Sequence, residues 1–331
     1  MTATKHLLVI PVVLSLLALS GCALSPNTTR PATLYDSQLV DSQSRQVLSL
    51  EAVADAAMQA DVVVIGEHHG HQASHLLQAR LLQQLHSRNP NIVLTLEQFD
   101  LDRQTALNDY LAGITGETEL VKDAKAWDNY RGSYRPLIEY ARHHQLPVLA
   151  ANAPADIVRC VGRQGPDYLT SLTDSQRRQL PDQPFLDTPA YRNKFITAIT
   201  GSHGSNDPAI AQRMDNVYQA QLVRDNTMAD RILQARRQYP DHQILHLTGT
   251  FHSEQKLGTV ALLKQRAPEL SIVVLSPVFW PEDAVEPPLQ DNLNKGDFLY
   301  LIPPLAPEFR NSERRQEAMT ERFKDRSGTD C

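Results

Sequence analysis

Two stretches, VVVIGEHH at residues 62–69 and ILHLTGTFH at residues 244–252, decide the fold. Each begins with a short run made mostly of Val, Ile and Leu. Runs of this kind, without polar alternation, are typical of strands buried on both faces. Each run is followed at once by Gly-x-x-His, so a turn-forming glycine and a histidine stand at the end of each predicted strand.

Further apolar runs predict a sheet built around these two strands. They lie at residues 92–96, 147–150 and 272–275, and residues 298–302 read as a final edge strand. Helical patterns separate the runs, for example the stripe formed by Leu77, Leu81 and Leu85. This alternation predicts an α/β fold, in which a mostly parallel sheet is flanked by helices.

A long segment without strand-like runs interrupts the alternation. Its helical patterns lie at residues 155–161, 175–180, 191–200 and about 209–237. We therefore expect an inserted all-helical subdomain over 153–243. The α/β domain would then consist of 49–152 and 244–305, followed by a polar C-terminal tail over 306–331.

Composition excludes some functional classes. The 331 residues include 32 Lys and Arg against 38 Asp and Glu, and the net charge is -6. Without a basic cluster, a nucleic-acid partner is not expected. Three cysteines are too few for a disulfide framework. An oxidising periplasm permits a bond between Cys160 and Cys331, but two free thiols are the favoured interpretation.

The N-terminus predicts lipid anchoring. Residues 1–21 have a positive start and a short apolar core, which is typical of a signal peptide. The segment ends in Leu-Ser-Gly-Cys at residues 19–22, which resembles a bacterial lipobox, so Cys22 is the expected lipidation site. The alternative is a chance Cys after an ordinary signal peptide. Ala23 follows rather than Asp, which favours the outer membrane. A polar segment, 22–48, reads as a flexible tether.

Polar side chains at the strand ends predict a functional site. His69 and His252 follow two strands, Glu97 ends a third, and parallel strands share one carboxyl edge. Two imidazoles and a carboxylate can hold a divalent metal, or they can act as an acid/base pair. Alternatively, they only cap exposed backbone amides. His71 and His75 have a spacing that can chelate a metal, but a solvated His-rich helix start is the simpler interpretation.

Several motifs in consistent order carry a family resemblance that runs from about Asp61 to Leu263. They are IGEHH at 65–69, LEQF at 96–99, Trp127, Tyr134-x-Pro136, Tyr140–Arg142, LPVLAAN at 146–152, Gln219–Gln221, Arg224-Asp225-x-x-Met228-Ala229 and GTFH at 249–252. Together with the lipobox, they resemble the ChaN-type haem-binding lipoproteins of the Tiki superfamily. The resemblance implies a parallel α/β domain with a helical subdomain, haem binding, and a role in bacterial haem or iron uptake or storage.

The sequence does not single out one residue as the ligand of the haem iron. A tyrosine oxygen suits ferric iron, and the absence of Cys-x-x-Cys-His excludes covalent c-type attachment. Tyr218 is the favoured iron ligand, with His203 nearby in the helical segment. Tyr191, Tyr130 and Tyr134 are further candidates, and the alternative for any one of them is an amphipathic packing residue.

Three functions follow as hypotheses. The first is an outer-membrane lipoprotein, facing the periplasm or the cell surface, that binds haem as its cofactor, with a homodimer and an outer-membrane haem receptor as possible partners. The second, implied by relatives of the superfamily, is a metal-dependent protease or esterase that uses the paired Gly-x-x-His cleft. The third is a lipid-tethered interaction module.

Overall fold

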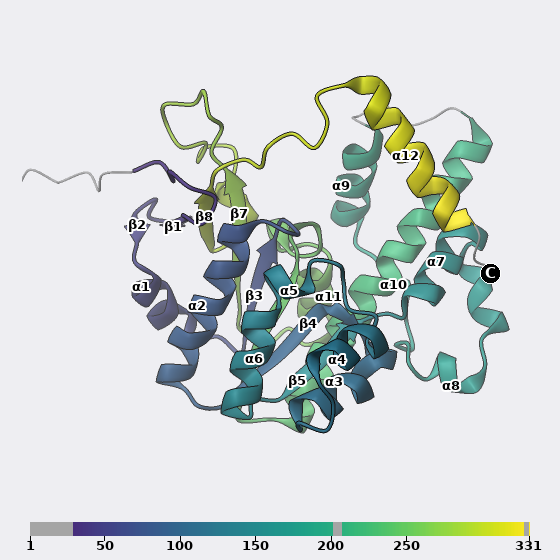
Figure 1. Ribbon diagram of the computed structural model, residues 1–331, viewed down its shortest axis with the longest axis horizontal. Coiled ribbons are helices and arrows are strands. Elements are labelled where there is room, and N and C mark those ends of the chain that lie inside the picture. The colour runs from purple at the N-terminus through teal and green to yellow at the C-terminus, as the bar shows by residue number, and fades with distance from the viewer. Residues whose placement is uncertain (1–28, 201–206, 328–330) are drawn as a thin grey trace, which may run out of the picture.

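An eight-stranded, mostly parallel sheet forms the centre of the protein, as the sequence predicts (Figure 1). The computed structural model describes residues 29–200, 207–327 and 331. The predicted signal peptide, Cys22 and His203 therefore lie outside the described residues. The strand order is β2-β1-β8-β7-β3-β6-β4-β5. The strands are β1 (Gln38–Asp41), β2 (Val47–Leu48), β3 (Val62–Glu67), β4 (Ile92–Asp100), β5 (Val148–Asn152), β6 (Gln243–Gly249), β7 (Ile272–Phe279) and β8 (Phe298–Ile302).

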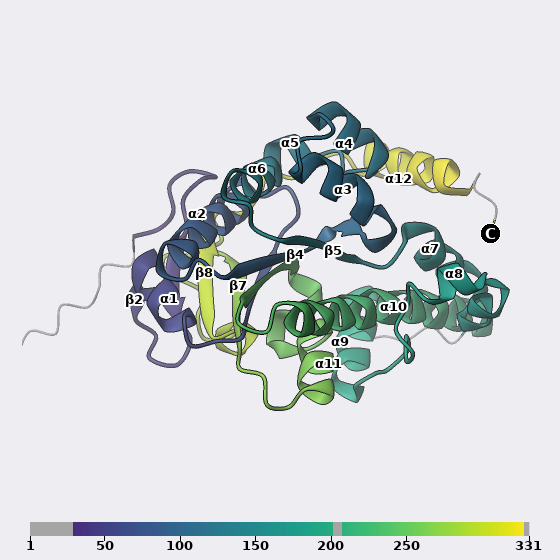
Figure 2. The ribbon, with the colours of Figure 1, turned by 90° about the horizontal axis from the view of Figure 1, so that it is seen from below.

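Helices cover both faces of this sheet (Figure 2). They are α1 (Leu50–Ala57), α2 (Gln72–Arg88), α3 (Gln104–Leu111), α4 (Glu117–Asp123), α5 (Tyr130–Ser133), α6 (Arg135–His144), α7 (Ala155–Gln164), α8 (Asp174–Arg177), α9 (Pro189–Thr200), α10 (Pro208–Gln238), α11 (Thr259–Arg266) and α12 (Ser312–Ser327). Successive residues of a strand point to opposite faces. Val63 and Ile65 of β3 therefore pack with α1, α2 and α6, whereas Val62 and Val64 pack with α10 and α11.

The predicted tether is partly ordered, which corrects its assignment as flexible over 22–48. Residues 38–48 form the β1–β2 hairpin, and β1 pairs antiparallel with β8. The final strand, Phe298–Ile302, is therefore not an edge strand. The consecutive residues Leu39 and Val40 of β1 are buried in different hydrophobic clusters, so apolar contacts on both faces hold this short hairpin on the sheet. The short strands and the polar turn between them hide this pattern in the sequence.

The predicted helical segment between β5 and β6 is helical, but it is not separate from the sheet. Its helices α7, α8, α9 and α10 coincide with the expected patterns. The C-terminal half of α10 packs Ala229, Ile232 and Ala235 against Val62, Val64 and other sheet residues. Removal of the whole segment would therefore uncover one face of the sheet. None of the described helices is long and apolar enough to cross a membrane.

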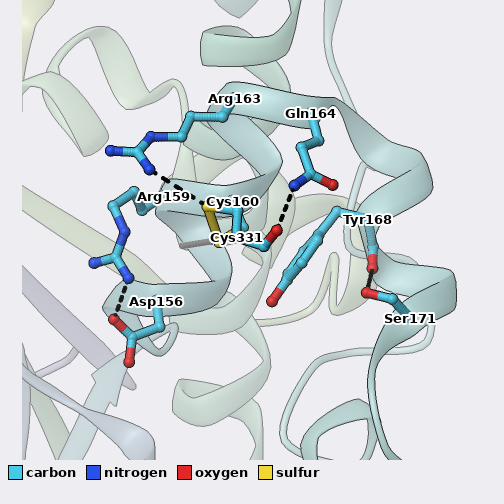
Figure 3. The surroundings of a disulfide bond; sticks show 8 residues. All are labelled: Asp156, Arg159, Cys160, Arg163, Gln164, Tyr168, Ser171 and Cys331. Atoms are coloured by element: carbon cyan, nitrogen blue, oxygen red, sulfur yellow. Dashed lines mark hydrogen bonds and ion pairs between the residues drawn. A yellow bond between two sulfur atoms is a disulfide. The ribbon is translucent and has the colours of Figure 1, made fainter. Parts of the chain in front are cut away.

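The C-terminal tail also differs from expectation. It forms α12, and Cys331 is joined to Cys160 of α7 by a disulfide, with the two Cα atoms 5.3 Å apart (Figure 3). The prediction of two free thiols is therefore wrong. Gln164 donates a hydrogen bond of 2.9 Å to the carbonyl oxygen of Cys331. The two cysteines are 171 positions apart, and no local pattern shows that the chain end returns to α7.

Candidate functional site

The two Gly-x-x-His motifs lie side by side at the carboxyl edge of the sheet. β3 and β6 are parallel neighbours, and Glu67 is in register with Gly249. β4 pairs with the other side of β6, which brings Glu97 to the same edge. The convergence of His69, Glu97 and His252 predicted from the strand ends is thus a consequence of strand order. We refer to these residues, with Glu67 and Asp225, as the carboxyl-edge cluster.

His69 is oriented by a buried carboxylate. Its Nδ1 lies 2.7 Å from Oε1 of Glu67, which also accepts a hydrogen bond of 2.6 Å from the hydroxyl of Tyr134. Gln78 donates to the other carboxylate oxygen at 2.6 Å. Burial opposes the charged imidazole, but the hydrogen bond to Glu67 and the nearby carboxylates outweigh it and raise the pKa of His69. The side chain is 45% exposed, although its Nε2 lies close to Gly249 of β6.

His252 is held between two carboxylates. Its Nδ1 lies 2.9 Å from Oδ1 of Asp225, and its Nε2 lies 3.5 Å from Oε1 of Glu97. Burial lowers the pKa of this imidazole, yet the charges of Asp225 and Glu97 raise it overall. The same Asp225 accepts hydrogen bonds from Tyr191 at 2.7 Å and from Thr259 at 2.8 Å. One buried side chain therefore joins His252, Tyr191 and Thr259.

Glu97 completes the cluster. Its Oε2 accepts from the hydroxyl of Thr248 at 2.7 Å and from the backbone N–H of Gly249 at 2.6 Å. Burial alone would raise the pKa of Glu97, but His252, His69 and these hydrogen bonds lower it to about 2. A Cβ atom at Gly249 would lie 2.8 Å from Nε2 of His69. A glycine is therefore required where the His69 ring crosses β6.

The structure does not support the predicted metal site. Among the residues that the structure describes, no group of three or more His, Cys, Asp or Glu side chains could hold a metal ion. His69 and His252 do converge with Glu97, and Nδ1 of each imidazole is bound to a further carboxylate, Glu67 or Asp225. The arrangement is a set of charge pairs, which can act in proton transfer.

The spaced pair His71 and His75 is structural. His71 accepts a hydrogen bond from the N–H of Ala73 at the start of α2, and its Nε2 lies 2.8 Å from the carbonyl oxygen of Pro303. His75 accepts from the N–H of Gly70 at 3.1 Å. The two rings therefore serve different backbone groups. Both side chains are buried, so the expectation of a solvated helix start is wrong.

The candidate haem ligands lie in a second region, formed by α9 and α10. Tyr191 and Tyr218 are both buried, and each donates to a carboxylate, Asp225 and Asp187 respectively. Burial and these carboxylates raise the pKa of each phenol well above its usual value. The other candidate, Tyr134, is bound to Glu67. The assignment of Tyr218 as the iron ligand stays a prediction.

Apolar side chains gather on the outer surface of these two helices. We call this surface the α9–α10 face and define it as Ile196, Ile199, Ile210, Met214 and Val217. On α10, the spacing of four and three residues places the last three on one side of the helix. Ile199 is 50% exposed and Ile210 is 48% exposed.

A hollow of about 210 Å³ opens into the α9–α10 face. Its walls are formed by Arg192, Phe195, Ile196, Ala211, Met214, Asp215 and Tyr218. The floor contains packed aromatic rings, since the ring centroids of Phe195 and Tyr218 are 4.8 Å apart. Arg192 lies over the Tyr218 ring at 5.2 Å and is paired with Asp215 at 2.6 Å. An apolar hollow with one guanidinium at its wall suits a flat apolar ligand that carries carboxylates.

Sequence reasoning missed Asp225 as a member of the carboxyl-edge cluster. The residue lies on the buried side of α10, three positions from both Leu222 and Met228. A carboxylate on an apolar helix stripe is rare without a partner, so this spacing was a usable signal. The partner itself, His252, could not be identified without the tertiary fold.

Comparison with known proteins finds a family model and a solved structure that each match most of the chain. The family model described as haem-binding uptake, Tiki superfamily, ChaN matches residues 53–263. A solved structure described as cofacial haem binding to ChaN of Campylobacter jejuni has a TM-score of 0.59 and 18% identity. The match covers 81% of this chain and 98% of that chain, which shows a shared fold.

Two other similarities are more limited. The chloroplastic Protein RETICULATA-RELATED 5 of Arabidopsis thaliana is 25% identical over 266 residues, which is 74% of this chain. The chain spans about a third of the length of that relative, since the match covers 35% of it. A mutant of the erythromycin esterase EreC aligns over 85% of this chain with a TM-score of 0.45 and 15% identity, a likeness too low to argue from.

Proposed function

The chain belongs to the haem-binding uptake family of the Tiki superfamily typified by ChaN, and from that premise we propose that it binds haem on the α9–α10 face. Haem is a flat apolar ring with two carboxylates at one edge. The described surface offers apolar contact from the isoleucines of both helices and from Met214. Arg192 at the wall of the hollow is placed to meet a carboxylate.

One observation carries this proposal, namely the exposure of several large apolar side chains on two adjacent helices. Monomeric soluble proteins rarely leave contiguous apolar patches exposed unless the patch binds something. The carboxyl-edge cluster offers no such surface, because its members are polar and mostly buried. The α9–α10 face is thus the better candidate for an apolar ligand.

The shape of the face favours an open site. The hollow, at about 210 Å³, is smaller than the roughly 300–1,000 Å³ of pockets that enclose a ligand. A ligand seated there would keep one of its faces uncovered. A second haem on a second copy of the chain would cover that face. This agrees with the cofacial arrangement described for the Campylobacter jejuni protein and makes a homodimer part of the proposal.

Tyr218 is the proposed iron ligand, and Asp187 is its proton acceptor. The phenol lies at the wall of the hollow and donates to a carboxylate oxygen of Asp187. Its raised pKa means that it keeps its proton in the free protein. Ligation of ferric iron requires the phenol proton to leave, and Asp187 lies within hydrogen-bond distance to receive it.

A haemin titration with matched variants tests the location. Ile210→Glu introduces a charge on the proposed face and should lower haemin affinity by about tenfold or more, which is about 1.4 kcal/mol. Ile114→Glu is the control, because Ile114 is 73% exposed in the turn between α3 and α4. It should bind as the parent does. Equal affinities for both variants would place haem elsewhere.

A spectrum tests the ligand separately. Tyr218→Phe should shift the haem absorbance and weaken binding, since the iron loses an oxygen ligand. Suppose that Tyr218→Phe leaves the spectrum unchanged while Ile210→Glu weakens binding. Haem would then bind on the α9–α10 face, but Tyr218 would not be its iron ligand.

Membrane anchoring through Cys22 is the second part of the proposal. Several acyl chains on one cysteine give stable anchoring, at about 0.8 kcal/mol per buried CH₂. Cys22→Ser should therefore release the exported protein from outer membranes, as measured by fractionation. An anchored haem protein fits haem or iron uptake or storage, and an outer-membrane haem receptor is the partner to seek by cross-linking.

A hydrolytic activity is the alternative, and the geometry of His69 favours it. The imidazole is oriented by a buried carboxylate and remains partly exposed, as a general base requires. His69→Ala should abolish such an activity, measured with ester and peptide substrates. His143→Ala, at an exposed position of α6, is the control. Activity that is lost on chelation would restore the metal-dependent version of this hypothesis.

A further inference from the structure

A rigid turn near the N-terminus presents two apolar side chains to solvent. The carboxylate of Asp36 accepts hydrogen bonds from the N–H of Ala32 at 3.1 Å and of Thr33 at 2.8 Å, and the N–H of Asp36 donates to the carbonyl of Thr33. Between these anchors, Leu34 is 39% exposed and Tyr35 is 63% exposed. The turn thus has a fixed shape with an apolar tip.

The turn is also fastened to the body of the protein. Arg30 donates to the backbone carbonyls of Trp280 at 3.5 Å and Glu282 at 2.5 Å. Behind the turn, a cavity of about 530 Å³ is lined by apolar residues such as Leu39, by polar residues such as Gln38, and by Tyr35 and the exposed Arg80. An exposed guanidinium and an apolar tip at one cavity are a combination that suits lipid phosphates and the headgroup boundary.

The position of the turn in the chain points to its partner. Thr29, the first described residue, follows Cys22 by seven positions, which span at most about 25 Å when fully extended. A chain anchored through Cys22 therefore keeps this turn close to the bilayer surface. This step rests on the lipid anchor proposed above.

We propose that Leu34 and Tyr35 form a membrane-contacting tip that rests in the headgroup region of the phospholipid bilayer. Tyrosine suits that region because its ring is apolar and its hydroxyl stays in contact with water. Arg80 meets lipid phosphate beside the tip. The protein is thereby held by two contacts, the acyl chains and the tip, and takes one orientation on the membrane.

This orientation has a consequence for the α9–α10 face. In both views the N-terminal described segment lies at one end of the molecule, α7, α8 and the start of α10 lie toward the other end, and α9 lies between (Figures 1 and 2). With the tip on the bilayer, the α9–α10 face is held at a distance from the membrane. Haem bound there would be open to a second copy or to another protein.

Depth-dependent quenching of tryptophan tests the contact. The full lipidated chain is reconstituted in vesicles of phosphatidylethanolamine and phosphatidylglycerol, with or without brominated acyl chains. The emission added by Tyr35→Trp should be quenched by the brominated lipid, relative to the parent chain with its native tryptophans. Ile114→Trp and Val217→Trp, which lie away from the tip, should show no added quenching. Leu34→Asp combined with Tyr35→Trp should reduce the quenching.

Each other outcome overturns the proposal in a recognisable way. Equal quenching at positions 35, 114 and 217 would mean that the chain has no preferred orientation. If the chain pellets with the vesicles but shows no quenching at position 35, the lipid anchor is supported and the proposed membrane contact of the tip is contradicted. A chain that does not pellet with the vesicles at all would overturn the anchor, and the tip with it.

Discussion

The carboxyl-edge cluster and the α9–α10 face share one helix but have opposite chemistry. Asp225, in the middle of α10, is fully buried and is bound by His252, Tyr191 and Thr259. Ile210, near the start of the same helix, is half exposed. In the first region each charge already has its partner within the protein. In the second, apolar surface faces water, which costs about 25 cal/mol per Å² until something covers it.

This difference separates two kinds of evidence for function. Buried polar groups must be paired for the fold to be stable, so a cluster of them is explained by folding alone. Exposed apolar groups do not help the fold, so their clustering indicates a partner. The histidine motifs that dominate the sequence thus have a sufficient structural explanation, whereas the unremarkable isoleucines do not.

The largest expected effect tests whether the carboxyl-edge cluster is structural. Asp225→Ala removes a carboxylate that pairs with His252 and leaves the hydroxyls of Tyr191 and Thr259 without their acceptor. Breaking a buried pair from one side should lower the free energy of unfolding by about 3–5 kcal/mol. Urea denaturation followed by circular dichroism measures this loss.

Asp215→Ala is the matched control on the same helix. Asp215 pairs with Arg192, but both side chains are partly exposed, so the loss should be within about 1 kcal/mol. Similar losses for the two variants would contradict the contrast between the regions.

A second test concerns the end of the molecule that carries α7 and the start of α10. Cys331→Ser removes the disulfide that ties the chain terminus to Cys160 and should cost about 2–4 kcal/mol in non-reducing buffer. Hydrogen exchange should speed up in α7, while β3 and β6 stay protected. The parent protein in reducing buffer should match the variant. If the free energy of unfolding of the parent protein is the same in reducing and non-reducing buffer, this disulfide does not stabilise the fold.

The sheet was predictable because its strands are buried on both faces and read as continuous apolar runs. Parallel strands end at one edge, so the meeting of His69, Glu97 and His252 also followed from strand order. The β1–β2 hairpin was not predictable, because β2 (Val47–Leu48) is too short to show a pattern. The disulfide was not predictable either, because its cysteines are 171 positions apart.

The partners of each site residue were the least predictable part. The interaction of His252 with Asp225 joins the segment after β6 to the middle of α10, and nothing in either local sequence indicates it. The hydrogen bond from Tyr218 to Asp187 likewise joins a helix to a loop. Periodicity shows which side of a helix is buried, but pairing across elements depends on how they are packed.

The pH dependence of stability should carry the signature of the carboxyl-edge cluster. The pKa of Glu97 is lowered to about 2 from 4.5, so its contribution is present above pH 4.5 and is lost as the pH falls toward 2. The pKa of His252 is raised from 6.5, so its contribution is present below pH 6.5 and is lost as the pH rises through the raised value. A pKa that differs by one between the folded and unfolded states corresponds to about 1.4 kcal/mol of stability.

Unfolding free energies measured from pH 2 to 9 should therefore be highest between about pH 4.5 and 6.5. Glu97→Gln should flatten the acidic side of this profile, because the amide does not titrate. If Glu97→Gln loses stability with falling pH as steeply as the parent does, other carboxylates cause the acidic loss of stability.

The smallest expected effect is a change in haemin affinity, and it tests most directly whether the carboxyl-edge cluster and the α9–α10 face have separate roles. If haem binds on the α9–α10 face, substitutions in the carboxyl-edge cluster should change haemin affinity by less than about 1 kcal/mol, as for separate sites. His252→Ala is the direct variant, but it leaves Asp225 and Glu97 without their cation and lowers stability. His69→Ala is therefore measured beside it, because that side chain is 45% exposed. Both proteins are compared with Ile210→Glu in one haemin titration. Should His69→Ala abolish binding while Ile210→Glu binds normally, the roles of the two regions are reversed: haem then lies at the carboxyl edge, and the apolar face serves another partner.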